Sequence, residues 1–289
     1  MPAAPLVWLI TGCSSGIGRA LAIAAIKRGD LVIATTRAKS FDTIRNLTEI
    51  GAHIMELDVT ASLDHLKEVA AEAVKVYGRV DVVMNNAGFA LRGSLEETSH
   101  EDSLAQFNTN LFGALNVSRT FLPHMRERGT GTICFIGSCF GWAPFPFTGL
   151  YNASKFALRG MADTLNQEIS QFGLRSICFD SGCFRTQIID HIAPIVSNID
   201  AYNEAGHSNN TLLFSLNGKQ KGDPERGVNV IIDVVKREGL AAVLSDDEIP
   251  SGFALGQDCY NAVKEECEKT LARLEKWKAL TFSTDYPDN

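Results

Sequence analysis

The strongest constraint on the fold is a regular alternation of short apolar runs with longer amphipathic ones. The short runs cover residues 6–10, 31–34, 53–57, 80–84, 132–136 and 174–179, and the longer runs between them cover 17–28, 41–49, 63–77, 104–125 and 151–172. Each short run is almost continuously apolar, which is typical of strands covered on both faces. Strands alternating with helices are joined by right-handed crossovers. The sequence therefore predicts an α/β fold, a doubly wound, Rossmann-type parallel sheet with helices on both faces.

The alternation stops after residue 179. Residues 181–222 mix apolar side chains with Asn, Ser, Gly and His without a sustained period. Such a stretch is either a disordered excursion or a functional lid, and we favour a substrate lid. Asp223-Pro224 then predicts a helix that runs to about residue 238. A last helix, at 258–278, has an apolar stripe that indicates core packing or a subunit contact rather than a ligand site.

The length allows one large domain or two small ones, but the chain has no repeat or linker. We therefore expect a single domain over residues 1–289. Its parts are a core (5–180) that holds the candidate catalytic residues, a lid (181–222) and C-terminal helices (223–289).

Charge and cysteine content exclude several classes of protein. The net charge of −7 disfavours binding to nucleic acid. Seven cysteines without a Cys-x-x-Cys pair are typical of reduced thiols, and the equal spacing of Cys134/Cys139 and Cys178/Cys183 is better explained by buried small residues than by a metal site. The N-terminal residues lack a basic segment and a long apolar run. We expect no metal, no membrane span and a cytoplasmic location.

A glycine-rich segment lies between the first predicted strand and the first predicted helix. It reads Thr11-Gly-Cys-Ser-Ser-Gly-Ile-Gly18. Glycines let the backbone turn sharply and approach a pyrophosphate, and the helix N-terminus offers free N–H groups to the anion. The segment predicts that residues 5–180 bind a dinucleotide, with contacts from Gly12, Ser14, Ser15, Gly16, Ile17 and Gly18.

The end of the second predicted strand favours NADP(H) over NAD(H). NAD-binding folds commonly carry an acidic residue there, whereas this chain has Thr36-Arg37. A guanidinium can form charge-assisted hydrogen bonds to a 2′-phosphate, with the hydroxyls of Ser14 and Thr36 beside it. The alternative is that Arg37 is a solvated surface charge.

Tyr151 and Lys155 begin the long helix after the fifth predicted strand and share one helical face. A free tyrosine has a pKa near 10, and a nearby ammonium should lower it toward neutrality. Ser138, at the end of the preceding strand, can offer its hydroxyl to the same carbonyl oxygen. The three residues predict an acid and an electrophilic clamp. The alternative is a surface tyrosine with a partly solvated lysine.

In this order the motifs resemble the short-chain dehydrogenase/reductase family, over nearly the full length. They are Thr11-Gly-x-x-x-Gly16-x-Gly18, Asp58-Val59, Asn85-Asn86-Ala87-Gly88, Asn110, Ser138 and Tyr151-x-x-x-Lys155. The glycine motif also resembles that of the retinol- and hydroxysteroid-dehydrogenase-like members. The likeness implies a dimer or tetramer built from the helices at about 101–127 and 151–172.

The resemblance implies a role for each matched residue. Tyr151 would exchange the proton, Lys155 would hold the nicotinamide ribose and lower the tyrosine pKa, Ser138 would orient the substrate oxygen, and Asn110 would anchor a relay water. The cofactor groove would be lined by Asp58, Val59, Asn86, Ala87, Gly88, Tyr151, Lys155, Gly182 and Thr186. One departure is Ser181, which stands where the family usually has proline, so the nicotinamide contact of Thr186 is less secure.

An aromatic, proline-containing segment follows Ser138. Its rigid apolar side chains suit a bulky hydrophobic substrate. With Ser138, the expected substrate contacts are Phe140, Trp142, Phe145 and Phe184. The alternative is that these aromatics pack the lid against the core.

Three functions fit the sequence. The first is an NADPH-dependent reductase that converts a ketone or aldehyde to an alcohol, with Tyr151 as the general acid. The second is the same site oxidising a retinol- or steroid-like alcohol. The third, from another class, is a non-catalytic NADP(H)-sensing protein, although a sensor has no chemical need for Ser138, Tyr151 and Lys155 together.

Overall fold

The computed structural model describes residues 4–243 and 249–286, and its centre is a seven-stranded parallel sheet. The spatial order is β3-β2-β1-β4-β5-β6-β7, and every neighbouring pair is parallel. The strands are β1 (Val7–Ile10), β2 (Leu31–Thr36), β3 (His53–Glu56), β4 (Val82–Asn85), β5 (Gly131–Ile136), β6 (Leu174–Ser181) and β7 (Gly252–Leu255). The predicted doubly wound fold is confirmed, and β7 is a strand that the sequence pattern did not indicate.

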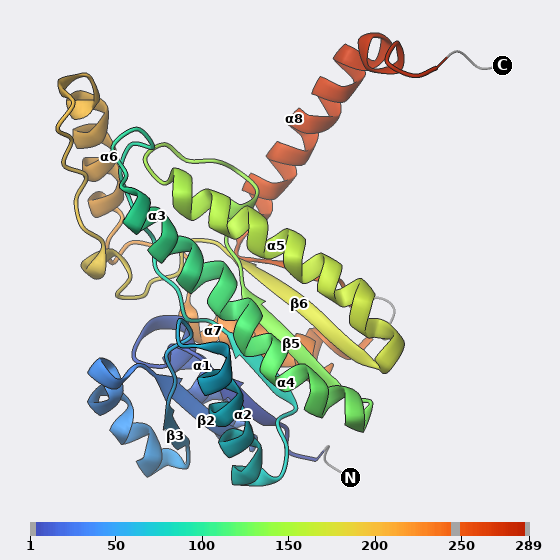
Figure 1. Cartoon of the computed structure of the whole chain (residues 1–289). Helices are drawn as coiled ribbons and strands as arrows, with labels where there is room; N and C mark the ends of the chain where they lie inside the picture. Colours follow the sequence, from blue (N-terminus) through green and yellow to red (C-terminus); the bar gives the residue numbers. More distant parts are fainter. Residues whose placement is uncertain (1–3, 244–248, 287–289) are drawn as a thin grey trace.

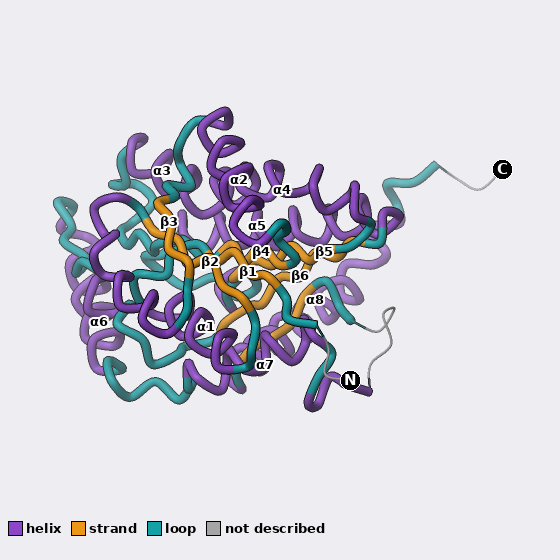
Figure 2. The backbone as a smooth tube through the Cα atoms, turned by 90° about the horizontal axis from the view of Figure 1, so that it is seen from below, coloured by secondary structure: helices purple, strands orange, loops and turns teal. Residues whose placement is uncertain are grey.

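Helices cover both faces of this sheet (Figures 1 and 2). One face carries α1 (Gly16–Lys27) and α7 (Pro224–Lys236), and the other carries α2 (Leu63–Tyr77), α4 (Ala114–Arg128) and α5 (Gly149–Ile169). Strand β1 is fully buried because its side chains enter both layers. Trp8 and Ile10 pack in one core, and Val7 and Leu9 pack in the other. This arrangement explains the continuous apolar runs of the sequence.

The strand order puts a topological switch point at the carboxyl ends of β1 and β4. From β1 the chain first builds outward through β2 and β3, and then crosses to the other side of β1 to form β4 and the strands that follow. Loops at such a topological switch point diverge, and ligands of doubly wound folds bind there. The fold therefore brings the loops after β1, β4, β5 and β6 to one edge of the sheet.

Two predicted helices differ in the structure. Residues 41–49 lie in a run of 3₁₀ turns (Ala38–Ile50) rather than an α-helix, and hydroxyls such as that of Thr43 bond to nearby backbone carbonyls. The predicted helix over 104–125 is interrupted. Helix α3 (His100–Phe107) passes into a π-helical turn (Asn108–Gly113) before α4 begins.

The lid is more regular than expected. Residues 181–222 include helix α6 (Asn203–Ser215), so the prediction of an irregular segment is wrong there. The lid also bonds to the loop before α3. Glu97 accepts hydrogen bonds from Ser197 and from the N–H groups of Asn198 and Ile199. Shorter 3₁₀ turns occur at Cys139–Gly141, Ser170–Phe172, Ile189–His191, Asp200–Tyr202 and Gly239–Val243.

The last helix, α8 (Gln257–Phe282), projects from the body of the protein (Figure 1). Its large apolar side chains are exposed. The expectation of core packing is therefore wrong for this helix, and of the two expected roles only a subunit contact is compatible with this exposure. The described residues do not include 1–3, 244–248 and 287–289. The last two of these ranges belong to the predicted C-terminal helices (223–289). No helix within 4–243 or 249–286 combines the length and apolar character that a membrane crossing requires.

Candidate active site

The glycine-rich loop packs closely against the segment after β4. The hydroxyl of Thr11 accepts hydrogen bonds from the N–H groups of Asn86 and Ala87, at 3.0 Å each. The Asn86 amide donates to the carbonyl oxygens of Thr11 and Gly12, at 2.8 and 3.1 Å. A Cβ atom at Gly18 would collide with the Asn86 amide. The glycine at this position is therefore required by the close approach of the two segments.

The N-terminus of α1 is open to a ligand. Gly12 and Gly16 have φ values of 72° and 58°, which favour glycine. Ser15 is the N-cap residue, yet its side chain makes no capping hydrogen bond. The side chain of Thr186, from the start of the lid, lies 3.7 Å from where a Cβ of Gly16 would be. The predicted residues Gly16 and Thr186 thus meet across this helix end, which is a favourable site for a pyrophosphate.

Cations gather where β2 and β3 end. Arg37 is exposed directly after β2, and Lys39 follows it in the 3₁₀ segment. Both interact electrostatically with Asp58. Partial burial opposes ionisation of Asp58, but two hydrogen bonds from Thr60 and the charges of Arg37 and Lys39 lower its pKa overall. The sequence interpretation missed Lys39, although its place two residues after Arg37 could have shown it.

Asn110 lies in the π-helical turn and is buried. Its side chain accepts from the Phe89 N–H at 3.0 Å and donates to the Phe89 carbonyl at 2.9 Å. It also donates to the hydroxyl of Ser154 at 3.3 Å, on the helix that carries Tyr151. π-Helical turns occur often at functional sites. Here the turn that interrupts the predicted helix positions Asn110 for these hydrogen bonds. It joins the loop after β4 to α5.

Tyr151 lies half-buried at the start of α5, beside Ser138. Burial raises the pKa of Tyr151 to about 12, although a hydrogen bond with Ser138 opposes this shift. The expectation that Lys155 lowers this pKa is not met, since the pKa is raised. The Lys155 ammonium lies 5.7 Å from the centre of the tyrosine ring, and burial of the hydroxyl is the main cause of the raised pKa. At neutral pH Tyr151 is therefore a protonated phenol.

Lys155 is buried and bonded to the sheet. Its ammonium donates to the carbonyl oxygen of Ile136 at 2.6 Å. Burial lowers its pKa to about 8, while the Cys178 thiol and the Asp180 carboxylate act to raise it. The charge of Lys155 consequently depends on its neighbours in the range where many enzymes work.

The sequence interpretation missed Asp180, a buried carboxylate behind these residues. It accepts a hydrogen bond from the indole N–H of Trp142 at 2.7 Å, and the guanidinium of Arg159 stacks over that indole at 3.7 Å. Burial raises the pKa of Asp180, whereas the hydrogen bonds and Arg159 oppose the rise, as does the backbone N–H of Ser138. Asp180 thus positions Ser138 and acts electrostatically on Lys155. An acid ending an apolar strand was the signal for it.

The predicted substrate contacts separate into two groups. Phe140 packs edge-on against Tyr151, with ring centres 6.0 Å apart, and stacks on Phe145 at 5.6 Å. These two rings form an apolar wall beside the phenol. Trp142 is bonded to Asp180 instead. Phe184 lies in the hydrophobic core against Gly227, away from this wall.

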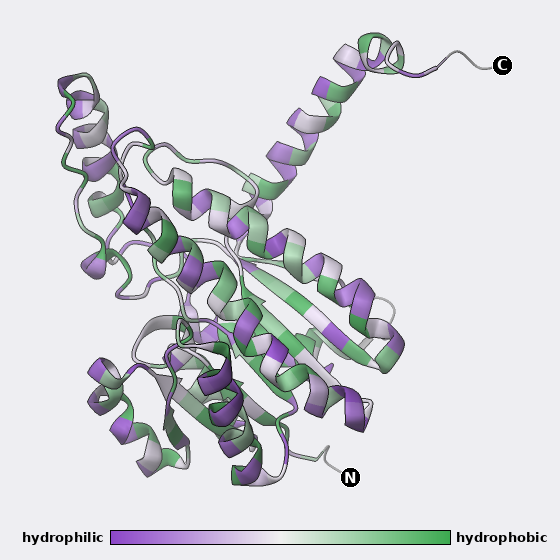
Figure 3. Cartoon of the chain, viewed as in Figure 1, coloured by the Kyte–Doolittle hydropathy of each residue, from purple (hydrophilic) through white to green (hydrophobic). Residues whose placement is uncertain are grey.

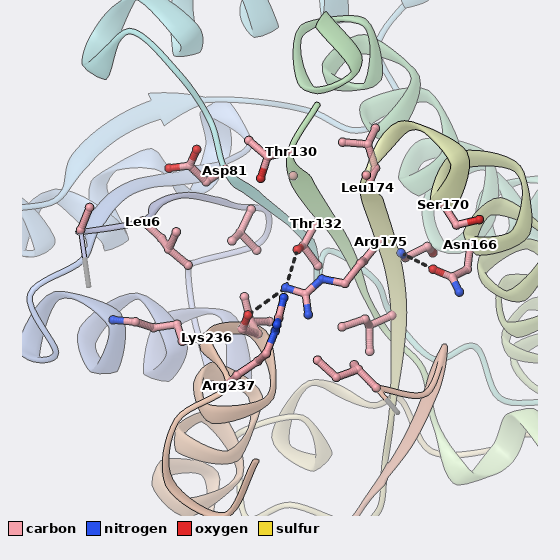
Figure 4. A pocket seen from close by; sticks show the side chains of 18 residues that line it. Leu6, Asp81, Thr130, Thr132, Asn166, Ser170, Leu174, Arg175, Lys236 and Arg237 are labelled. Carbon is pink, nitrogen blue, oxygen red and sulfur yellow. Dashed lines mark hydrogen bonds between the residues drawn. The ribbon is translucent and has the colours of Figure 1, made fainter. Parts of the chain in front are cut away.

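A separate pocket of about 860 Å³ lies at the opposite edge of the sheet (Figure 4). It is lined by the amino ends of β5 and β6 and by the end of α7. Arg175 spans it, donating to the Thr132 hydroxyl and the Val235 carbonyl. None of the candidate catalytic residues lines this pocket.

Comparison with known proteins agrees with this geometry. The family model for short chain dehydrogenase matches residues 6–194. The chain belongs to this family. Within it, the chain is 30% identical to Oxidoreductase BOA17 of Botryotinia fuckeliana over 287 residues, which cover 96% of this chain and 98% of that protein.

Solved structures show the same architecture. A short-chain dehydrogenase from Streptomyces avermitilis has a TM-score of 0.85 and 32% identity, covering 98% of this chain and all of that one. ElxO, solved with NADP bound, has a TM-score of 0.68 and 25% identity, covering 87% of this chain and 97% of that one. The chain is therefore an oxidoreductase that acts on CH–OH or C=O groups.

Proposed function

We propose that this chain is an NADPH-dependent carbonyl reductase for bulky apolar ketones or aldehydes. The observation that carries the proposal is the position of Tyr151, whose ring packs edge-on against Phe140 in the apolar wall and whose hydroxyl is hydrogen-bonded with Ser138. Reduction needs an acid that begins the reaction protonated, and burial keeps this phenol protonated at neutral pH.

The residues of the dinucleotide site fit NADP(H). The loop backbone and the uncapped end of α1 suit the pyrophosphate. Arg37 and Lys39 suit a 2′-phosphate, since the residues directly after β2 include no carboxylate. ElxO holds NADP on a similar fold. When bound, the cofactor supplies the hydride, and the protein supplies position and charge.

The protein's own side chains orient the substrate and transfer the proton. The Ser138 hydroxyl orients the substrate oxygen toward Tyr151, and the Tyr151 hydroxyl donates its proton to that oxygen as charge develops there. Lys155 stabilises the phenolate that is left and binds the nicotinamide ribose, and Asn110 anchors a water that returns a proton. Asp58, Val59, Ala87, Gly88 and Gly182 line the groove.

The proposal is tested with a purified sample and a panel of aromatic and alicyclic ketones. We expect consumption of NADPH, monitored at its near-ultraviolet absorbance, to be faster than consumption of NADH at equal concentration. Turnover only in the oxidative direction would replace the reductase by an alcohol dehydrogenase. Tight NADPH binding without turnover on either alcohols or ketones would indicate a sensor.

The pH dependence tests the role of Asp180. The ammonium of Lys155 is present below a pH of about 8 and is lost as the pH rises through that value. We therefore expect reductase activity to fall on the alkaline side. Asp180→Asn removes a charge that raises the Lys155 pKa, so its alkaline limb should move to lower pH.

The measurement is kcat from pH 6 to 9.5 for both proteins with saturating ketone. Asp190→Asn, which makes the same change at an exposed lid residue bonded to Asn217, is the control. An alkaline limb that stays at the same pH in Asp180→Asn would contradict the electrostatic role of Asp180.

A further inference from the structure

Among the described residues, helix α8 is anchored at its base. Cys259 is buried in the first turn, and the Asp258 carboxylate accepts a hydrogen bond from the Cys183 N–H at 2.6 Å. From Leu271 to the end of α8 every residue is exposed, and the helix stands clear of the other elements (Figure 1). A helix of 26 residues is about 39 Å long.

The exposed part of α8 is amphipathic (Figure 3). Its large apolar side chains are each more than half exposed; these are Tyr260, Leu271, Leu274, Trp277, Leu280 and Phe282. Together with Val263 and Cys267, most of them recur every three or four residues, which places them along one side of the helix. A continuous apolar stripe of this kind marks a surface that another element covers.

The charges of α8 are divided between its two halves. The first half, 258–269, has four acidic residues and two basic ones, whereas the second half, 270–282, has three basic residues and one acidic. Such a helix is complementary to itself when reversed, because the acidic half of one copy then faces the basic half of the other. A parallel pair would instead oppose like charges.

We propose that α8 is a self-association helix that pairs antiparallel with α8 of a second copy of this chain. A two-fold axis near residues 269 and 270 makes the contact isologous. It places Glu266 opposite the partner's Arg273 and brings Tyr260 within one helical turn of Trp277 of the partner subunit. Glu266 and Arg273 are seven residues apart, so both flank the stripe on the same side. Within the described part of the chain, neither takes part in an ion pair.

The composition of α8 argues for this occupant over a lipid surface. Helices that lie on anionic membranes carry mostly Lys and Arg on the polar face. Helix α8 has five acidic and five basic residues, and the chain has a net charge of −7. The polar face is therefore better suited to a partner that carries both acidic and basic residues than to anionic headgroups.

The first test compares the mass of the full chain in solution with that of a Leu271→Glu/Leu274→Glu variant by sedimentation equilibrium. We expect the assembly mass to fall by a factor of two in the variant. Leu240→Glu is the matched control, because Leu240 is 95% exposed in the 3₁₀ turn after α7. Circular dichroism shows whether the fold is kept. Equal masses for the wild type and the α8 variant would overturn the proposal.

The second test addresses the antiparallel register. Glu266→Arg or Arg273→Glu alone creates two like-charge contacts across the two-fold axis, which should raise the dissociation constant about tenfold. The double variant Glu266→Arg/Arg273→Glu exchanges both charges and should restore it to within about twofold. If the double variant is as weak as the singles, the register is wrong. If the wild type does not self-associate but binds phosphatidylserine vesicles, the apolar stripe of α8 contacts a membrane surface instead.

Discussion

Replacing Tyr151 by phenylalanine is expected to lower kcat for ketone reduction about a thousandfold. The substitution removes only the hydroxyl that donates the proton, and general acid catalysis contributes about 10²- to 10⁴-fold. The ring that packs against Phe140 is kept, so the fold and the apolar wall should not change. Steady-state kinetics of NADPH oxidation give kcat, and fluorescence titration gives the NADPH affinity, which should stay within about twofold.

The control for this variant is Tyr286→Phe, which makes the same chemical change at a residue that is 97% exposed. Its kcat should equal that of the wild type. If Tyr151→Phe kept more than about a tenth of the activity, the proton would have to come from another group, and the proposed mechanism would fail.

Reversing the charge of Arg37 and Lys39 together is expected to weaken NADPH binding about a hundredfold. Each charge-assisted hydrogen bond contributes about 1.5 kcal/mol, and about 1.4 kcal/mol corresponds to a tenfold change in affinity. The Arg37→Glu/Lys39→Glu variant should bind NADH as well as the wild type does, or better. Isothermal titration calorimetry with both nucleotides measures the difference.

Arg45→Glu provides the matched control, since Arg45 is an exposed cation in the same 3₁₀ segment and pairs with Asp42. It should leave both affinities within about twofold of the wild type. Wild-type protein that binds NADH as tightly as NADPH would remove the basis for an NADP(H) preference, whatever the variant does.

Burial explains why the electrostatics of the site differ from the sequence interpretation. The four-residue spacing correctly places Tyr151 and Lys155 on one helical face. It contains no information about how far each group is removed from water. Desolvation raises the tyrosine pKa and lowers the lysine pKa, and further contributions come from side chains in β6 and in the segments after β5 and β6. Only the packed structure shows which of these effects dominates.

The alternation of apolar and amphipathic runs determined the sheet, because buried strands need continuous apolar side chains whatever their partners. The glycine loop and the Tyr151 and Lys155 pair were also determined by local pattern, since their chemistry depends on residues a few positions apart. The π-turn at Asn110, the placement of Asp180, the burial of Phe184 and the projection of α8 were decided by tertiary contacts alone. Each depends on groups far apart in the chain, and local spacing does not encode the distance between such groups.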